Sequence, residues 1–476
     1  MNILQKMNKK IKVFLIIALL FAGLFIKCYY ISYTETWQRQ HDVIGFGADE
    51  GHAAYIEYLI NNGHLPDFDP REKWAFFQPP LHHIVSAYIM NASARFGATE
   101  HRAQENTQVA TCIYMVLLTV FATYMFLKSK GTGKLFKKNS ASKLSTEGYI
   151  VMLSVIALHP MFILLSGSIN NDGLSLMLSV LALIIGVIWF DNPGYLTTAV
   201  LAAVIGLSMM AKLLGGLVAV PIGILMFMRV FGLDNRYVGG KSIRISIGDR
   251  LRLFFKKYFV KCLLFAVIVF PLGLGFEIRN SLKWGVPFNY IPGVGENFSE
   301  EITLSRRFFD IKPGLTKVYT FLTTRGDAFD EYNIPLAVIK TSLFSEFSFE
   351  DASRWMKPLT LVLFVSSVVL MVYAFYGTIY MVFSKRSKLD TKWKITLFGT
   401  YITYLVAYIM FAIQYRNYSA QDFRYGAICI ICEGIFAGLY TDTLKNRKVK
   451  IAVVIIALVF AASAFLTYAL LGFKSK

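Results

Sequence analysis

Charged residues are scarce in this chain: they make up 17% of its 476 residues, whereas hydrophobic residues make up 55%. A soluble protein of this length would fold as two or three domains with far more surface charge. The short alternating segments that a membrane barrel needs are also missing. Both classes are therefore excluded. What the chain does contain is a series of apolar runs of about 20 residues, each long enough to cross a bilayer as a helix.

Cysteine is equally scarce, and the sequence lacks several other signals. The five cysteines fall in or beside apolar segments, so no external disulfide framework is implied. Neither HExxH nor a paired-cysteine zinc pattern occurs. Matching halves are absent, which argues against a duplicated transporter, and so is any low-complexity tail. We therefore expect a single integral-membrane domain over residues 1–476, with no separate soluble domain and no cofactor.

Eleven apolar segments predict an all-α polytopic membrane protein. The first follows four lysines but is longer than a signal-peptide core, so it is interpreted as a retained anchor. The predicted membrane helices span residues 13–33, 107–127, 148–166, 173–190, 195–211, 213–230, 259–277, 358–383, 395–413, 425–441 and 451–472.

Lysine and arginine positions predict the orientation of these helices. Five basic clusters hold 27 of the 49 basic residues: the N-terminus, 128–143, 229–257, 384–394 and 442–450. All five fall on one side if the helices alternate in direction, and short cytoplasmic loops retain positive charge. The N-terminus is therefore predicted to be cytoplasmic and the C-terminus external. The net charge of +19 then reflects loops that face anionic membrane lipids, and no nucleic-acid partner is expected.

The predicted external segments carry an unusual set of polar residues. Two of these segments are long, residues 34–106 and 278–357, and three are short, near 167–172, near 212 and at 414–424. Their notable side chains are Asp49, Glu50 and His52 in "GADEGHAAY", Gln78 and His82 in "FFQPPLHH", Asn171 and Asp172 in "SGSINND", Lys212 in "MMAKLLGG", Arg279 in "EIRNSLKWGVPF", and Tyr415, Arg416 and Arg424 in "QYRNYSAQDFRY".

Each of these charges has a simple structural explanation when it is taken alone. Asp172 can cap a helix, Lys212 can extend its ammonium to the interface, and the two loop arginines can face water. A charge at the centre of a membrane helix costs roughly 2.5–3.5 kcal/mol, however, so a concentration of charge at one membrane face favours a functional site. Cations suit a lipid-linked phosphate, and a nearby carboxylate can remove a proton from an attacking hydroxyl. The pattern therefore indicates sugar transfer from a polyprenyl-phosphate donor.

Several of these segments resemble GT-C glycosyltransferases, in particular the protein O-mannosyltransferases and aminoarabinose transferases. The resemblance is carried by "ADEGHAAYIEYLINNGHLP", "QPPLHHIVSAYI", "HPMFILLSGSINNDGLSLMLSVLALI", "AKLLGGLVAVPI" and "RNSLKWGVPF". It covers most of residues 45–290 and, more weakly, the loop at 414–425. It implies a GT-C-like bundle in a bacterial cytoplasmic membrane, with an extracytoplasmic active site between two long loops.

The resemblance also implies a role for individual residues. Asp49 would be the catalytic base, Glu50 would assist it, and Asp172 would be a second acidic residue of the site. The donor phosphate would be bound by Lys212, Arg279, Tyr415 and one of Arg416 or Arg424, and the substrates would contact His52, Gln78, His82 and Asn171. One sugar would pass, with inversion, to a glycan, lipid or protein acceptor. Asp-Glu pairs are common in proteins, so the pair is informative only because it follows the first predicted membrane helix on the external side.

Two alternatives remain open from the sequence. Six of the seven histidines lie in the first long loop, and a divalent metal bound by Asp49, Glu50 and His52 is conceivable. A transporter or lipid flippase is the competing class of protein, and it would place charged or helix-broken sites near the middle of the membrane. The sugar and the acceptor cannot be read from the sequence.

Overall fold

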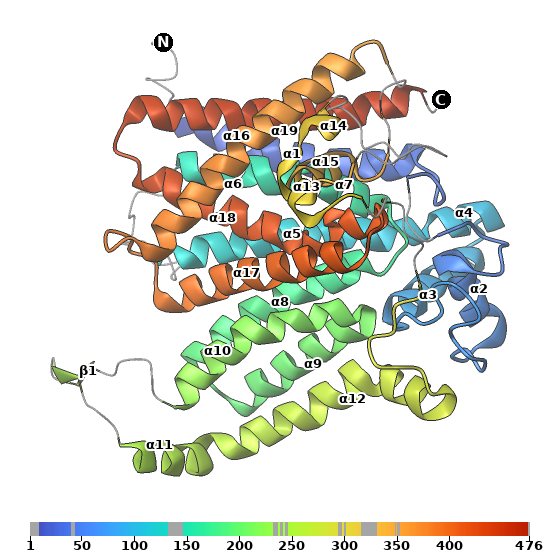
Figure 1. Cartoon of the computed structure of the whole chain (residues 1–476), viewed down its shortest axis with the longest axis horizontal. Coiled ribbons are helices and arrows are strands. Elements are labelled where there is room, and N and C mark those ends of the chain that lie inside the picture. Colours follow the sequence, from blue (N-terminus) through green and yellow to red (C-terminus); the bar gives the residue numbers. More distant parts are fainter. Residues whose placement is uncertain are drawn as a thin grey trace.

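The structure is a computed structural model and is almost entirely helical (Figure 1). It describes residues 9–39, 43–131, 146–231, 237–238, 241–242, 246–293, 298, 301–315, 331–347, 349 and 353–474. Parts of the predicted basic clusters at the N-terminus, 128–143 and 229–257, and of the predicted loops at 34–106 and 278–357, lie outside these residues. Two two-residue strands, β1 (Tyr237–Val238) and β2 (Lys241–Ser242), pair antiparallel.

The predicted all-α membrane class is confirmed. Within the described residues, eight helical segments are long and apolar enough to cross a membrane, or ten if two bent pairs each count as one. The long helices are α1 (Lys9–Tyr33), α5 (Thr107–Ser129), α8 (Asp172–Asp191), α10 (Ala219–Val230) with the preceding turn η2 (Leu213–Val218), α12 (Phe259–Trp284) with α11 (Ile247–Leu253) and η3 (Phe254–Tyr258), α16 (Met356–Phe383), α17 (Thr391–Gln414) and α19 (Arg447–Lys474).

Three of the eleven predicted spans differ from a straight, full-length helix. The segment 148–166 is α6 (Thr146–Ala157) and α7 (Pro160–Gly167), bent by 40°, and 425–441 is α18 (Ile428–Thr443), bent by 47° from the turns before it. The third is α9 (Tyr195–Ala211), which has 17 residues and packs along α8 and α12. The first bend has a local cause, since Pro160 cannot donate a backbone hydrogen bond and the His159 ring caps the new helix by accepting from the Met161 amide at 3.3 Å.

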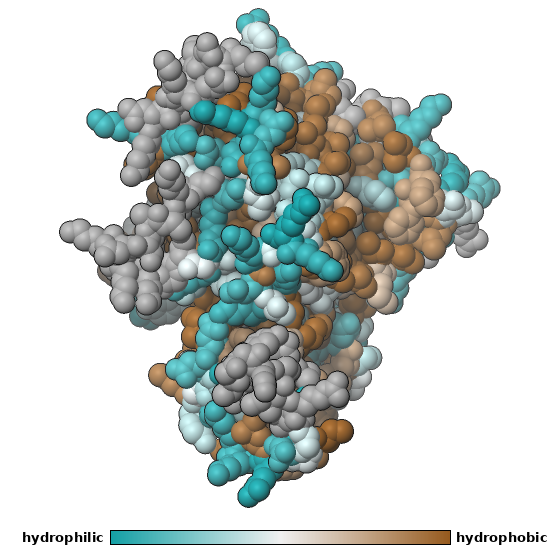
Figure 2. Space-filling model, turned by 90° about the vertical axis from the view of Figure 1, so that its left-hand side faces the viewer, coloured by the Kyte–Doolittle hydropathy of each residue, from teal (hydrophilic) through white to brown (hydrophobic). Residues whose placement is uncertain are grey.

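Ion pairs join the helix ends that the sequence places on the side of the basic clusters. Lys12 of α1 pairs with Glu147 of α6 at 2.5 Å, and Lys392 of α17 pairs with Asp191 of α8 at 2.6 Å. Hydrophilic side chains cover much of this end of the molecule, seen end-on in Figure 2, whereas hydrophobic side chains flank it. These pairs place the start of α1 beside the start of α6 and the start of α17 beside the end of α8, which agrees with the alternation that the basic clusters predict for these four helices.

The opposite end of the bundle carries short helices from the two long loops. From the first loop these are α2 (Gly51–Asn62), α3 (Leu81–Arg95) and α4 (Glu100–Glu105), grouped at the right of Figure 1. From the second loop they are α13 (Leu304–Phe309), α14 (Lys312–Leu315) and α15 (Ile334–Phe344). The sequence did not predict α15, an apolar helix that packs against α7 and against the turn η5 (Phe423–Gly426), which follows η4 (Ser419–Gln421).

Two glycines allow α6 and α18 to pack with their backbones in contact. A Cβ atom on Gly148 would lie 2.3 Å from the carbonyl oxygen of Gly438, and a Cβ on Gly438 would lie 2.6 Å from that of Gly148. Membrane helices associate through such small residues because lipid offers no hydrophobic drive for helix pairing. This glycine contact fixes α18 beside α6 at the end of the bundle opposite to η5.

Candidate functional site

Three charged side chains from distant parts of the sequence meet where α8 begins. Asp172 is the first residue of α8, Lys212 directly follows α9, and Arg424 lies in η5 just before α18. The Lys212 ammonium lies 2.5 Å from Oδ1 of Asp172, and Nε of Arg424 lies 3.8 Å from Oδ2. The structure thus brings together one predicted acid and two predicted phosphate-binding cations.

Tyr425 completes this group with an aromatic face. Its ring centroid lies 4.9 Å from the Lys212 ammonium and 4.9 Å from the Arg424 guanidinium carbon, and its hydroxyl accepts a hydrogen bond from Arg424 at 2.8 Å. Both contacts are within the range of cation–π attraction. A cavity of about 20 Å³ adjoins the group, with Tyr404 among its lining residues. A cavity of this size holds about one water molecule.

The turn η5 is held in place by α15. The two oxygens of Asp422 accept from the Arg424 amide at 2.8 Å and from the Ser345 hydroxyl at 2.6 Å. The Phe423 amide donates to the Thr341 hydroxyl at 2.9 Å. These partners are buried, so the position of Arg424 depends on a short helix of the second long loop.

A cluster of serines joins α8 to α9 about one helical turn before Lys212. Ser208 donates its hydroxyl to the Ser175 carbonyl at 3.0 Å, and Ser175 donates in return to the Ser208 carbonyl at 3.2 Å. Ser179 lies 3.0 Å from the Ser208 hydroxyl. The sequence analysis missed these serines. Their i, i+4 spacing from 175 to 179 was the available signal, since it places two hydroxyls on one helix face.

The first long loop docks on the turn that precedes Asp172. Asn171 donates its amide to the Ala211 carbonyl at 2.9 Å and to the Gln78 side chain at 3.1 Å. His82 donates Nε2–H to the Ile169 carbonyl at 2.7 Å. Burial lowers the pKa of His82 to about 4, against the opposing effects of that hydrogen bond and of the Asp172 charge. These contacts bring the first loop to the same end of the bundle as the Asp172 group.

Two further histidines support this docking inside the loop. His52 and His83 are buried and share a hydrogen bond of 2.8 Å, with their rings stacked at 5.1 Å. Tyr55 stacks on His83 at 4.2 Å. Burial, with the neighbouring imidazoles as a smaller cause, places the pKa of His83 well below its usual value. The structure thus places His52 and His82 in a buried scaffold, and their contact with substrate stays a prediction.

Asp49 and Glu50 are exposed on the turn before α2. Gly51 has a φ of 97°, a conformation that favours glycine, and its amide donates to the Trp74 carbonyl at 3.0 Å. Oε2 of Glu50 accepts from the Trp74 amide at 3.4 Å. Within the described part of the chain, the Asp49 carboxylate contacts neither Asp172 nor its cations. The catalytic role assigned to Asp49 and Glu50 stays a prediction.

The other predicted phosphate ligands contact other partners. Arg279 donates to the Pro66 carbonyl at 2.6 Å and so ties the end of α12 to the first loop. Arg416 donates to the Ile302 carbonyl at 3.4 Å, and the Tyr415 ring packs on Phe411 at 4.8 Å. Of the two loop arginines that the sequence could not separate, the structure therefore brings Arg424 to the Asp172 group.

Asp49, Glu50 and His52 do not form a metal cluster among the described residues. A different group with metal-ligand spacing lies near the end of α1, formed by Glu35, His101 and Glu105.

Comparisons with known proteins give similarity at the level of structure. No family model matches the sequence, and no curated protein matches it. Among solved structures, the crystal structure of ArnT from Cupriavidus metallidurans in the apo state matches with 13% identity and a TM-score of 0.39. The structure of the same protein bound to undecaprenyl phosphate matches with 14% identity and a TM-score of 0.41. Each match covers 97% of this chain and 77% of the other.

Proposed function

We propose that this protein is a GT-C-type glycosyltransferase of the bacterial cytoplasmic membrane. It moves a single sugar from a polyprenyl-phosphate donor to a hydroxyl of a glycan, lipid or protein acceptor on the extracytoplasmic side. The observation that carries this proposal is the convergence of Lys212 and Arg424 on Asp172 at the end of the bundle where the two long loops pack. Two cations gathered at one point suit a lipid-linked phosphate.

The donor phosphate binds between Lys212 and Arg424 in this proposal. A guanidinium can pair with phosphate oxygens through two parallel hydrogen bonds, and an ammonium adds a compact charge. Asp172 holds both cations in position before the donor arrives. When the bond between sugar and phosphate breaks, negative charge grows on the leaving phosphate, and the same two cations stabilise it.

Asp49 acts as the general base in the proposed reaction. Its carboxylate takes the proton from the acceptor hydroxyl as that oxygen attacks the anomeric carbon. The bond between the anomeric carbon and the phosphate oxygen breaks in the same displacement, and the polyprenyl phosphate leaves with the electron pair. The configuration at the anomeric carbon is therefore inverted. The step needs no cofactor. The exposed position of Asp49, on a turn shaped by Gly47 and Gly51, supports this role because an acceptor can reach it from water.

Transport or lipid flipping is the second candidate function. It is favoured by a cavity of about 40 Å³ inside the bundle that is lined by His159 and Glu433. Ionisable side chains within a membrane protein commonly line pathways for ions or protons. The two functions differ in their product, since only a transferase separates the sugar from its lipid.

The proposal is tested with full-length protein in liposomes, with a polyprenyl-phosphate sugar as donor. We expect mass spectrometry to find a polyprenyl phosphate in the purified protein and an acceptor heavier by one sugar after reaction. Lys212→Gln and Arg424→Gln should each weaken donor binding at least about tenfold. Lys283→Gln is the matched control, because Lys283 is a cation of the same end that pairs with Asp67. Undiminished donor binding in both site variants, or movement of the intact donor across the bilayer, would overturn the proposal.

A further inference from the structure

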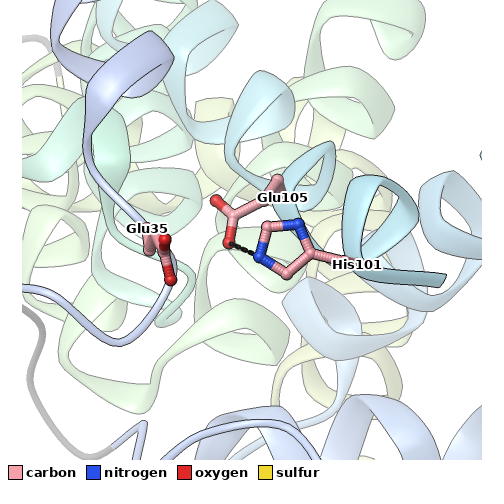
Figure 3. Close-up of side chains that lie close together, drawn as sticks. All are labelled: Glu35, His101 and Glu105. Carbon is pink, nitrogen blue, oxygen red and sulfur yellow. Dashed lines mark ion pairs between the residues drawn. The ribbon is translucent and has the colours of Figure 1, made fainter. Parts of the chain in front are cut away.

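A second group of ligand-type side chains lies outside the Asp172 group, where α1 meets α4. Glu35 follows the end of α1 by two residues, and His101 and Glu105 are one turn apart on α4. One ligand atom from each residue lies within 4.8 Å of the other two. Figure 3 shows the three side chains gathered from the two segments, with His101 and Glu105 paired at 3.9 Å. We propose that Glu35, His101 and Glu105 bind one divalent transition-metal ion of the zinc type.

The set of donor atoms identifies the class of ion. One imidazole nitrogen and two carboxylate oxygens make three protein ligands, which leaves a further position for water. An imidazole favours zinc and its neighbours, whereas magnesium and calcium prefer oxygen ligands alone. Ligand atoms of a tetrahedral zinc site lie about 3.4 Å apart for bonds of about 2.1 Å. Binding therefore draws the three side chains slightly closer than they stand here.

The geometry of α4 explains why His101 and Glu105 lie close together. It does not explain why Glu35 lies beside them, so the position of Glu35 is the stronger evidence for a bound ion. Residues i and i+4 share a helix face, so an ordinary ion pair accounts for His101 and Glu105. It does not account for Glu35, whose carboxylate comes from a segment about seventy residues away in the sequence and approaches a second carboxylate. Two like charges at this distance repel each other, and a bound cation removes that repulsion.

Neighbouring groups fix both carboxylates in their orientations. Glu105 accepts from the Thr36 amide at 3.3 Å and from the Gln108 side chain at 2.7 Å. Glu35 accepts from the Trp37 indole at 2.7 Å. Metal sites depend on such outer hydrogen bonds to orient their ligands. Three donors, two in the segment after α1 and one on α5, thus hold the cluster in a preformed arrangement.

The site is open to ions from solution and separate from the proposed transfer site. A cavity of about 480 Å³ adjoins the three ligands, with Trp37 and Phe46 also in its wall, and it shares no lining residue with the cavity at Asp172. The His101 side chain is 68% exposed, whereas that of Glu105 is 13% exposed. The ion thus ties the segment after α1 to α4, and the transfer step does not pass through it.

Metal binding is tested on the full-length, untagged protein in detergent after removal of metal with a chelator. We expect elemental analysis to find one zinc ion per chain after dialysis against micromolar zinc, and we expect zinc to raise the thermal unfolding temperature. Magnesium or calcium at the same concentration should not raise it. Cobalt(II) should give the visible absorption of a low-coordinate nitrogen and oxygen site. Absence of bound zinc and of any stabilisation in the wild-type protein would overturn the proposal.

Variants separate this site from adventitious binding at other histidines. Glu35→Gln, His101→Gln and Glu105→Gln should each weaken zinc binding at least about tenfold, since each removes one of three ligands. Glu100→Gln on the same helix and His64→Gln in the same loop are the controls, and both should bind zinc as the wild type does. Unfolding temperatures measured without metal show whether each variant is folded. Equal zinc affinity in the three ligand variants and the controls would overturn the proposal even if the wild type binds zinc.

Discussion

The ammonium of Lys212 lies 2.5 Å from Oδ1 of Asp172, so the residue that follows α9 pairs with the residue that begins α8. Both side chains are largely buried, at 16% and 7% exposure. Removal of one partner from such a pair leaves a charge in a poorly solvated site, which costs more than the pair itself contributes. The pair therefore links the stability of the bundle to the charge balance of the proposed phosphate site.

A double-mutant cycle measures this pair. We expect Asp172→Asn to lower the free energy of unfolding by about 3–5 kcal/mol, because it leaves two cations without their carboxylate. Lys212→Met should lower it by less, because Arg424 still faces Asp172. The double variant should lose clearly less than the sum of the two. Chemical unfolding in detergent measures all three, and Lys392→Met, at a more exposed pair, is the control with a loss below about 1 kcal/mol. Strictly additive losses would show that the two charges do not interact.

Arg424 and Arg416 form a natural matched pair eight residues apart. Arg424→Gln should abolish sugar transfer and weaken binding of the donor lipid, because it removes a cation beside Asp172. Arg416→Gln should change donor affinity by less than about threefold, because that arginine contacts Ile302. Binding of a fluorescent polyprenyl phosphate to each purified variant measures the difference. Equal losses in the two variants would contradict the assignment of Arg424.

The buried histidines make stability depend on pH in a defined direction. His82 has a pKa of about 4 in the folded protein, against 6.5 for an ordinary histidine. The unfolded chain therefore binds more protons between pH 6.5 and 4, and stability falls as pH falls through this window and rises as pH rises. Below pH 4 the loss from His82 reaches about 3 kcal/mol. Unfolding measured from pH 8 to pH 4 should show this decline, and His82→Gln should flatten it. An identical slope in that variant would rule out His82 as the cause.

Gly51 should be more sensitive to substitution than an unstrained helix glycine. Gly51→Ala forces an L-residue to a φ of 97° beside Asp49, so we expect a loss of about 1–3 kcal/mol in stability and a large drop in transfer. The control is Gly223→Ala in α10, where an added Cβ meets no atom within 4 Å. That variant should be as stable as the wild type or slightly more stable. Sugar-transfer rates and unfolding temperatures of both variants test this, and equal behaviour would contradict it.

The sequence predicts the helices well because apolar length is a local property. Each of the eleven predicted ranges lies on helical segments, and the shared placement of Asp172 and Lys212 at one end follows from the alternation of helices. The bend at His159 was also readable, in principle, from Pro160. The all-α membrane class and the placement of Asp172 and Lys212 at one end of the bundle can thus be predicted from the pattern of apolar segments.

What the sequence could not supply depends on packing between distant segments. Arg424 and Arg416 share one irregular loop, and the choice between them rests on Asp422 and on the docking of α15. The helix α15 is too short for its apolar run to distinguish it from a buried strand. The approach of Glu35 to His101 is likewise a long-range contact. Only the i, i+4 spacing of His101 and Glu105 was visible beforehand.

The backbone contact between Gly148 and Gly438 lies at the end of α18 that is farther from Arg424 and the Asp172 group. Since η5 lies at the other end of α18, we expect a methyl group added to either glycine to shift that helix and the arginine on η5. Inhibitors of this protein would therefore not have to resemble a sugar or a phosphate. A compact hydrophobic compound that separates α6 from α18 would act at the end of the bundle opposite to the Asp172 group, and in the proposed reaction it would not compete with donor or acceptor.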